Sequence, residues 1–260
     1  MNKEKDVLCG LGEIGSPLLK LISTSIKTIG YDVNPKLVNE SELLKFSSLP
    51  TELLHICIPY GEKFEENVLE LISKFKPLGV IIHSTIKPGT TEKLQKRLKI
   101  PVIYSATRGV HKRMLKDLKR YSKFYSVYDW APNSVWIKKT FENRMKKAGV
   151  KTKLMSSPLA LELAKIVVDT SYYGWLINYA QLSNMIAVKN KVDYDEMWSF
   201  AEEIHQYLGN RPKMFPGFIG GHCIIPNLDL MNDQTLNLIK EINSDYAKIL
   251  KKRQAQGKKY

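Results

Sequence analysis

Cysteine is scarce in this 260-residue chain, which has only Cys9, Cys57 and Cys223. An odd number of widely separated cysteines argues against a disulfide framework. No two of them have the close spacing of metal ligands in a zinc site. The sequence therefore predicts a fold that is held by a hydrophobic core, without a metal centre.

Long apolar runs are also lacking. The longest, such as Gly79–His83 and Ile166–Val168, fall far short of the roughly 20 residues that a membrane helix needs. The first residues lead almost at once into a candidate strand and a glycine turn, which leaves no room for a signal peptide. We therefore expect a cytoplasmic protein without a membrane span.

Acidic residues are in the minority, with 26 Asp and Glu against 40 Lys and Arg and a formal net charge of +14. Such a field attracts phosphates, nucleotides, nucleic acids or anionic membranes, and charge alone does not choose among them. Part of the excess lies in residues 251–260 and part in residues 112–123. We interpret the first as a basic C-terminal tail and the second as a solvated helix face.

The first half of the chain, from Asp6 to about Lys153, alternates short β-prone runs with stretches of helical periodicity. This alternation is typical of βαβ units, and it predicts an α/β fold with a doubly wound parallel sheet of the Rossmann type over residues 1–155. The predicted strands are Asp6–Cys9, Thr28–Tyr31, Leu53–Ile58, Val80–Ser84 and Val102–Tyr104, and the predicted helices are Ile14–Thr24, Phe64–Lys74 and Thr91–Leu98.

The second half has a different character. Leu159–Lys189 contains no proline and only one glycine, Gly174, and it is apolar on much of its circumference, which predicts one long and mostly buried helix. Further helical patterns, Tyr194–Leu208 and Gln234–Leu250, flank the Gly/Pro-rich stretch Gly209–Pro226. We predict an all-helical domain over residues 156–250.

The motif Gly10–Gly15, GLGEIG, follows the first predicted strand and opens a helix, the context that a dinucleotide fingerprint requires. Its glycines would permit a tight turn, close approach of a pyrophosphate and close packing of helix on strand, while the helix N-terminus supplies amide donors. Asp32 ends the second strand, where a carboxylate accepts hydrogen bonds from the adenosine ribose and repels the 2'-phosphate of NADP. The predicted NAD contacts here are Gly10, Gly12, Glu13, Ile14, Gly15 and Asp32. A glycine turn that binds no nucleotide is the structural alternative.

Three further motifs stand in order along the chain. Ser84–Thr91 reads STIKPGTT, Glu162–Lys165 reads ELAK, and Met214–Cys223 reads MFPGFIGGHC in an irregular loop, where binding and catalytic residues gather. Taken alone, Cys223 is more often a small buried hydrophobe than a nucleophile. Together with the glycine motif, however, these segments resemble the UDP-glucose/GDP-mannose dehydrogenase family in a shortened form without its C-terminal substrate-nucleotide domain.

The resemblance implies a Rossmann domain followed by a helical domain whose long helix mediates homodimerisation. It also implies that the alcohol of a nucleotide sugar is oxidised twice, each time with hydride transfer to NAD. Lys165 would stabilise the developing alkoxide and oxyanion, and the Cys223 thiolate would add to the aldehyde to give a thiohemiacetal, whose oxidation leaves a thioester. The resemblance places Pro59 and Thr85 at the cofactor and Gly220 and Gly221 at the substrate, whereas we interpret His222 as structural.

The chain departs from the family pattern at several positions. Asp169 stands four residues after the lysine, where the family has asparagine, and Asn227 stands four residues after the cysteine, where the family has aspartate. The carboxylate has thus moved from one position to the other. A compensated exchange that keeps the net charge of the site would give this pattern, and so would the decay of an unused site. Asp169 lies one helical turn from Lys165 in the sequence, within reach of an ion pair. The family also has glutamates after the fifth strand, for substrate binding and water activation, but Tyr104–His111 contains no carboxylate.

These observations leave several hypotheses. The leading one is an NAD-dependent dehydrogenase that acts on an alcohol of an anionic, nucleotide-sugar-like substrate, by a two-electron or a four-electron oxidation. A close variant is the β-hydroxyacid dehydrogenase plan, which also places a lysine at the start of a long helix and needs no cysteine. The alternative from another class is a catalytically silent NAD-binding regulatory or scaffold protein. Nucleic-acid binding ranks lower, because no recognised motif accompanies the basic residues.

Overall fold

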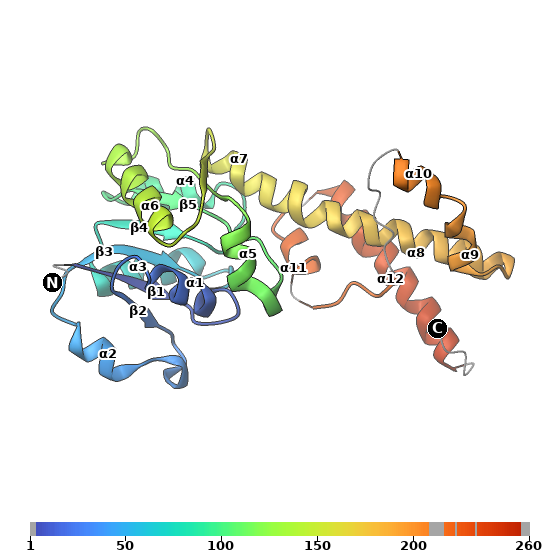
Figure 1. Cartoon of the computed structure of the whole chain (residues 1–260), viewed down its shortest axis with the longest axis horizontal. Coiled ribbons are helices and arrows are strands. Elements are labelled where there is room, and N and C mark those ends of the chain that lie inside the picture. Colours follow the sequence, from blue (N-terminus) through green and yellow to red (C-terminus); the bar gives the residue numbers. More distant parts are fainter. Residues whose placement is uncertain (1–3, 208–215, 222, 232, 256–260) are drawn as a thin grey trace. The chain divides into compact units, whose positions relative to one another are not determined.

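The computed structural model describes residues 4–207, 216–221, 223–231 and 233–255. The chain divides into two compact units, Met1–Lys165 and Ile166–Tyr260 (Figure 1). This division falls ten residues beyond the predicted boundary at 155/156, inside the long helical run. The reason is that the first helix of that run, α7 (Pro158–Leu163), packs on α4 (Thr90–Arg97) and β5 (Val102–Tyr104) of the first unit.

The first unit is built on a five-stranded sheet whose order is β2-β1-β3-β4-β5. Every pairing is parallel, and Val7, for example, lies opposite Ile29 on one side and Leu54 on the other. The sheet confirms the predicted α/β class, and each predicted strand is present with its ends displaced by at most two residues. The strands are β1 (Lys5–Cys9), β2 (Thr28–Tyr31), β3 (Thr51–Ile56), β4 (Gly79–Ile82) and β5 (Val102–Tyr104).

Helices cover both faces of this sheet, because successive strand residues point to opposite sides and both sides are apolar. On one face Leu8, Leu53 and Ile81 pack against α1 (Gly15–Ile22), α5 (Met114–Arg120) and α6 (Ser134–Lys147). On the other face Val7, Leu54 and Val80 pack against α3 (Phe64–Phe75), α4 and α7. The remaining helical segments of this unit are η1 (Pro35–Leu37), α2 (Glu40–Lys45) and η2 (His111–Arg113).

Two short strands were not predicted. β6 (Lys123–Tyr125) and β7 (Thr152–Leu154) pair in parallel as a separate small sheet. An antiparallel bridge ties this sheet to β5, since Tyr104 and Ser126 exchange two backbone hydrogen bonds of 2.9 Å. Three residues are too few to show the alternation by which a strand is recognised in a sequence.

The second unit is helical, as predicted. The helical run that begins with α7 continues through the π-helical segment η3 (Ala164–Ser171) into α8 (Tyr172–Asn190). The expectation that this run is mostly buried is wrong for the single chain, because several large apolar side chains of α8 are exposed. They include Tyr172, Tyr173, Tyr179, Leu182, Ile186 and Val188.

The other helices follow the predicted pattern with two corrections. The stretch predicted as Tyr194–Leu208 forms two helices, α9 (Tyr194–Ser199) and α10 (Glu202–Tyr207), and Leu208 lies outside the described residues. The last helix, α12 (Gln234–Ala255), includes residues 251–255, which were predicted as tail. A short helix, α11 (Ile225–Leu228), precedes it. Among the described residues, no helix combines the length and the apolar character that crossing a membrane requires.

Candidate functional site

The glycine turn follows β1 directly, and its three glycines differ in what surrounds them. Gly10 has φ of +94°, and a Cβ there would lie 2.7 Å from the carbonyl carbon of Cys57. A Cβ on Gly15 would lie 1.7 Å from the carbonyl oxygen of Gly10. In contrast, no atom lies within 4 Å of a Cβ built on Gly12. Packing therefore requires Gly10 and Gly15, whereas Gly12 leaves the backbone open to a ligand.

The start of α1 offers hydrogen-bond donors at this turn. No side chain caps the helix at Ile14, and its first turn contains no acidic residue. The first amides of a helix have no partner within the helix, and the helix dipole favours an anion at this end. The turn and helix therefore suit a pyrophosphate, as the sequence predicted.

Asp32 lies beside the turn. Its Oδ2 accepts a hydrogen bond from the backbone amide of Leu11 at 2.6 Å, and its Oδ1 accepts one from the amide of Asn34 at 2.8 Å. A carboxylate has about four acceptor positions, so capacity remains for two ribose hydroxyls. The geometry of the turn and of Asp32 together fits an adenine dinucleotide.

Glu13, predicted as a cofactor contact, lies against the side chain of His111. Its Oε2 lies 2.6 Å from Nδ1 of His111, at the start of η2. The contact ties the glycine turn to the segment after β5. Sequence reasoning did not find this relationship, because the two residues are far apart in the chain.

The other predicted cofactor residues follow β3 and β4. Pro59 is exposed and Thr85 is half-buried. Between them, the Ser84 hydroxyl donates a hydrogen bond of 2.5 Å to the carbonyl of Ile58, which joins the two chain segments. Since the carboxyl ends of parallel strands lie at one edge of a sheet, Pro59 and Thr85 share that edge with the glycine turn and Asp32.

Glu162, in α7, binds the turn that carries the STIKPGTT motif. Its Oε1 accepts hydrogen bonds from the amide of Thr91 at 3.0 Å and from the Thr91 hydroxyl at 2.5 Å, and its Oε2 accepts one from the amide of Gly89 at 2.6 Å. Burial raises the pKa of Glu162, although these hydrogen bonds act in the opposite direction. Lys165 lies three residues further on, half-buried in η3. The motifs ELAK and STIKPGTT are therefore physically joined through Glu162, a role that the sequence did not reveal.

Lys123 holds the segment after β5, which lacks the family's glutamates. Its Nζ donates hydrogen bonds to the carbonyl of Ser105 at 2.9 Å and to the hydroxyl of Thr107 at 3.3 Å. The pKa of Lys123 is lowered to about 7, chiefly by burial; the charge of Cys57 acts against this shift, and the charges of Arg108 and Lys165 act in the same direction as burial. The assignment of residues 112–123 to a solvated helix face is therefore wrong for Lys123, which lies buried in β6.

The loop of the second unit brings Cys223 and Asn227 together. The Asn227 side chain donates a hydrogen bond of 2.6 Å to the carbonyl of Cys223, across the first turn of α11. Cys223, Gly220 and Gly221 are exposed, and Gly221 has φ of +72°. His222 lies outside the described residues.

A buried polar cluster anchors the start of this loop to the helices of the second unit. Asn243 of α12 binds both backbone groups of Ile219, with its Oδ1 2.8 Å from the amide nitrogen and its Nδ2 3.1 Å from the carbonyl oxygen. Gln181 of α8 donates to Asn243 at 3.1 Å and to the carbonyl of Gly217 at 2.8 Å. The backbone that leads to Cys223 is thus fixed by side chains that sequence reasoning missed, because amides on a helix carry no motif.

Asp169 is exposed and lies in η3 together with Lys165. A π-helix has a wider turn than an α-helix, so the spacing of one α-helical turn assumed from the sequence does not apply to this pair. Short π-helical segments inside α-helices often mark functional positions.

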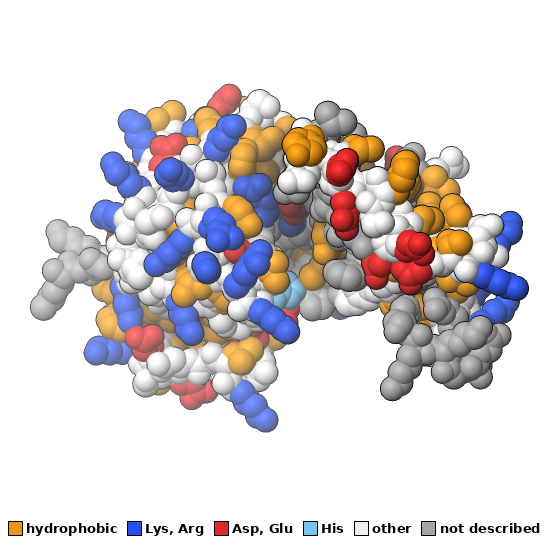
Figure 2. All heavy atoms as spheres, turned by 45° about the vertical axis from the view of Figure 1, so that its right-hand side comes forward, with side chains coloured by type: hydrophobic (Ala, Val, Ile, Leu, Met, Phe, Trp, Pro, Cys, Tyr) orange, Lys and Arg blue, Asp and Glu red, His pale blue; other side chains and the backbone are white. Residues whose placement is uncertain are grey.

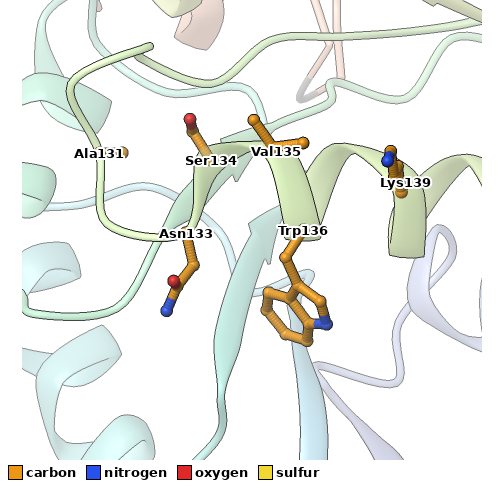
Figure 3. Close-up of a pocket in the computed structure, with 6 residues that line it drawn as sticks. All are labelled: Ala131, Asn133, Ser134, Val135, Trp136 and Lys139. Carbon is orange, nitrogen blue, oxygen red and sulfur yellow. The ribbon is translucent and has the colours of Figure 1, made fainter.

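Lysine and arginine side chains are spread over the face of the first unit that Figure 2 presents. A hollow with a volume of about 560 Å³ lies elsewhere in this unit, at the start of α6 (Figure 3). Trp136 on its wall is also a neighbour of Gly79, at the amino end of β4, opposite the edge that carries the glycine turn. The hollow contains none of the predicted site residues. It is lined by Ala131, Asn133, Ser134, Val135, Trp136 and Lys139.

No protein-family model matches the sequence, and no curated protein matches it closely enough to count as a relative. Solved structures do match. The UDP-D-ManNAc dehydrogenase from Pyrococcus horikoshii aligns with 97% of this chain and 72% of its own, at a TM-score of 0.76 and 17% identity. The UDP-N-acetyl-mannosamine dehydrogenase Cap5O from Staphylococcus aureus aligns with 97% of this chain and 70% of its own, at a TM-score of 0.72 and 17% identity.

A third structure matches over nearly its whole length. Psf3, solved in complex with NADP+ and 2-OPP, aligns with 96% of this chain and 94% of its own, at a TM-score of 0.60 and 14% identity. A protein of this extent and architecture with a bound nicotinamide cofactor is thus known. The chain has the fold of the nucleotide-sugar dehydrogenases, from its first strand to its last helix.

Proposed function

We propose that this chain is an NAD-dependent dehydrogenase that oxidises an alcohol of an anionic substrate, a nucleotide sugar in the first place. The observation that carries the proposal is the glycine turn, where Gly12 is open, the N-terminus of α1 is uncapped and Asp32 binds the Leu11 amide. The shared fold with two UDP-sugar dehydrogenases supports the substrate class. A cytoplasmic location stays a prediction from the sequence.

The proposed cofactor contacts lie in the first unit. Residues 10–15, Asp32, Pro59 and Thr85 hold NAD, which supplies the hydride acceptor. Lys165 stabilises negative charge on the substrate oxygen, the role that an ammonium group performs best where water is excluded.

In the second unit, Cys223 is the proposed nucleophile and Asn227 fixes its backbone through the hydrogen bond to the Cys223 carbonyl. Gly220 and Gly221 leave room for the substrate, because a Cβ on Gly221 would meet no atom within 4 Å. Asp169 is proposed to balance the charge of Lys165. Cys223 would serve a four-electron oxidation. A two-electron oxidation fits equally, because residues 104–111 contain no carboxylate to activate water for thioester hydrolysis.

We also propose a homodimer through α8. The exposed fractions of Tyr172, Tyr179 and Ile186 are 60%, 63% and 58%, and these residues recur every seventh position. Leu182 completes the pattern of a helix that packs on another helix. A stripe of large apolar side chains on one side of a helix contributes to stability only when another protein surface covers it, and a second copy of α8 would do so.

The test is NADH formation by the purified protein, followed by absorbance at 340 nm with UDP- and GDP-sugars, sugar phosphates and hydroxyacids. Cys223→Ser should abolish acid formation in the four-electron reaction. Lys165→Met should lower kcat by about a hundredfold or more, as loss of an oxyanion partner does in other enzymes. Lys189→Met, at the exposed end of α8, is the matched control and should leave the rate unchanged.

Other outcomes separate the competing hypotheses. Activity with hydroxyacids that survives Cys223→Ser would favour the β-hydroxyacid dehydrogenase plan. Clear NAD binding by calorimetry without turnover of any substrate would favour a catalytically silent cofactor-binding protein. Failure to bind NAD or NADP at millimolar concentration would refute the proposal.

A further inference from the structure

The two faces of the main sheet are covered by helices of very different charge. The helices on one face, α1, α5 and α6, contain nine basic and two acidic residues. The helices on the other face, α3, α4 and α7, contain four basic and five acidic residues. Among the helices that cover the sheet, the excess of positive charge therefore lies on one side.

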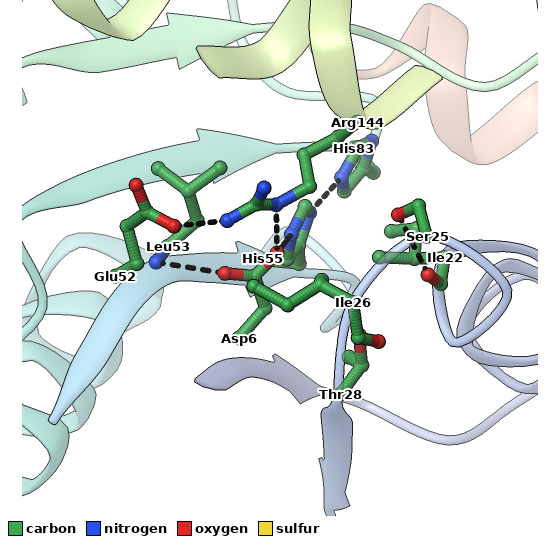
Figure 4. Close-up of polar contacts among 10 residues, drawn as sticks. All are labelled: Asp6, Ile22, Ser25, Ile26, Thr28, Glu52, Leu53, His55, His83 and Arg144. Carbon is green, nitrogen blue, oxygen red and sulfur yellow. Dashed lines mark hydrogen bonds and ion pairs between the residues drawn. The ribbon is translucent and has the colours of Figure 1, made fainter. Parts of the chain in front are cut away.

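Nearly all of this charge is in contact with solvent. Of the cations in α1, α5 and α6, all of which the structure describes, only Arg144 is buried. Its guanidinium binds the carboxylates of Asp6 and Glu52 in the core (Figure 4). Of the others, Lys138 is half-buried beside Asp129, and the rest are exposed. The side of the sheet that α1, α5 and α6 cover is therefore strongly cationic at its surface.

Residues 110–121, which include η2 and α5, carry five exposed cations on this side. The one acidic residue of the segment, Asp117, is 0% exposed. Its carboxylate accepts hydrogen bonds from the Val110 amide at 3.0 Å and from Nε of Arg113 at 2.9 Å, and its backbone carbonyl accepts one from the Tyr121 amide at 3.0 Å. Asp117 thus holds both ends of the segment on α5 and adds no negative charge to the surface. The exposed cations are Lys112, Arg113, Lys116, Lys119 and Arg120.

Large apolar side chains are exposed among these cations. The exposed fractions of Val110, Leu115 and Tyr121 are 51%, 40% and 39%. On α5, Leu115 shares the outer side of the helix with Lys116 and Lys119, because positions 114, 117 and 118 are buried. An apolar side chain among cations gains nothing from contact with water or phosphate oxygens. The boundary between lipid headgroups and acyl chains, in contrast, takes up both kinds of group.

Two kinds of polyanion match the charge of this surface, a nucleic acid and an anionic membrane. Proteins that bind nucleic acids use Ser, Thr, Asn and Gln beside their cations, for phosphates and base edges. Residues 110–121 contain none of these four residue types. Tyrosine, with an apolar ring and a polar end, is typical of membrane boundaries. The composition of the exposed surface therefore favours the membrane.

We propose that residues 110–121 form a docking surface for an anionic phospholipid bilayer. The five exposed cations bind the headgroup phosphates and carboxylates, and the apolar side chains enter the boundary between headgroups and acyl chains. Lys20 of α1, the helix that packs beside α5, extends the cationic surface. Docking brings the glycine turn close to the membrane, because His111 of this segment contacts Glu13 of the turn.

The test is co-sedimentation of the purified chain with large unilamellar vesicles, either of pure phosphatidylcholine or of an equal mixture of phosphatidylcholine and phosphatidylserine. We expect binding to the mixed vesicles and none to the pure ones at about 0.1 M salt, where the Debye length is about 10 Å. Binding should weaken at about 1 M salt, where this length falls to about 3 Å. Equal binding to both kinds of vesicle, or binding to neither, would overturn the proposal.

Variants locate the surface. Lys116→Gln combined with Lys119→Gln should lower the partition constant about 25-fold, since each cation near the bilayer contributes about fivefold. Leu115→Ser should lower it severalfold, because an inserted apolar side chain is lost. The matched control is Lys93→Gln combined with Lys96→Gln on α4, which removes the same charge from the opposite face and should leave the constant nearly unchanged. Circular dichroism checks that each variant folds.

Other results would assign the charge differently. Binding to a fluorescent RNA or duplex DNA that Leu115→Ser does not weaken, without binding to the mixed vesicles, would make nucleic acid the partner and overturn the proposal. Vesicle binding that Lys116→Gln with Lys119→Gln retains in full would place the contact elsewhere, for example in the basic residues 251–260, and would overturn it as well. These measurements need neither NAD nor a sugar substrate, so their result is independent of the proposed dehydrogenase activity.

Discussion

The Glu162 carboxylate lies 3.0 Å from the backbone amide of Thr91, and the two residues are 71 positions apart in the chain. The same carboxylate also binds the Thr91 hydroxyl and the Gly89 amide. These hydrogen bonds hold α7, at the start of the long helical run, against the turn that begins α4. Lys165 and Thr85 can act in one site only if these hydrogen bonds hold the two segments together.

Substitution of Glu162 by Gln should cost about 2 kcal/mol or more of unfolding free energy, because an amide group cannot accept all three hydrogen bonds in a buried position. Urea unfolding measures this change. Glu92→Gln is the matched control, since Glu92 lies in the same region and pairs with Lys96 at the surface, where such pairs contribute at most about 1 kcal/mol. An equal loss of unfolding free energy in the two variants would mean that the buried hydrogen bonds of Glu162 do not stabilise the fold more than a surface ion pair does.

Gly12→Ala and Gly15→Ala should have opposite consequences. A Cβ at position 15 would overlap the Gly10 carbonyl, so Gly15→Ala should destabilise the fold by about 3 kcal/mol or prevent folding. A Cβ at position 12 meets nothing, so Gly12→Ala should fold normally and weaken NAD binding, because the methyl group enters the space of the ligand. Thermal unfolding and calorimetric titration with NAD separate the two effects. Unchanged NAD affinity in Gly12→Ala would argue against cofactor binding at this turn.

Asp32→Asn should reduce the preference for NAD over NADP by about tenfold or more, since the repulsion of a 2'-phosphate by the carboxylate is lost. The Asn side chain can still accept a hydrogen bond from the Leu11 amide, so the turn should remain intact. Dissociation constants for both cofactors, measured for the unaltered chain and the variant, check this prediction. An unaltered chain that prefers NADP would contradict the assignment of Asp32.

Lys123→Met should change how stability depends on pH. The pKa of Lys123 is about 7 in the folded chain, against an ordinary value of 10.5, so its contribution to stability is present above pH 10.5 and is lost as the pH falls through 7. The unfolding free energy of the unaltered chain, relative to Lys123→Met, should therefore rise by about 1.4 kcal/mol per pH unit between pH 7.5 and 9.

Other titratable groups are common to both proteins, and those that do not interact with Lys123 cancel in the comparison. Lys119→Met, at an exposed position of α5, serves as the control and should show no such trend. A flat difference for Lys123→Met would mean that Lys123 keeps its charge in the folded state at pH 9.

Tyr179→Glu should convert the proposed dimer into a monomer, because it places a charge in the middle of the apolar stripe of α8. Light scattering coupled to size exclusion measures the mass in solution. The exchange Lys191→Glu, just beyond the end of α8, is the control for added negative charge. A chain that is monomeric before any substitution would rule out the dimer proposal.

Much of the fold could be predicted from local patterns. The five strands of the main sheet are continuous apolar runs between turns, and their parallel order follows from the helices that separate them. Strands β6 and β7 were missed because three residues carry no pattern. The two short helices between 194 and 207 were merged because their apolar spacing continues across Phe200 and Ala201.

The candidate site was predictable only where a motif carries it. The glycine turn and Asp32 are local features, and in the structure the Asp32 carboxylate accepts a hydrogen bond from the Leu11 amide of the turn. The partners of the motif residues were not predictable, because His111 for Glu13, Thr91 for Glu162 and Asn243 for Ile219 are brought close only by folding.

The sequence by itself determined the class of the fold and the glycine turn, since apolar periodicity and glycine spacing act over a few neighbouring residues. The tertiary structure alone decided which polar groups are buried. Lys123 reads as one more basic residue in the sequence, and His55 and His83 as isolated histidines. Folding removes all three from water and places them around the Ser105 carbonyl and Asp6, so their contacts come from segments that are far apart in the chain.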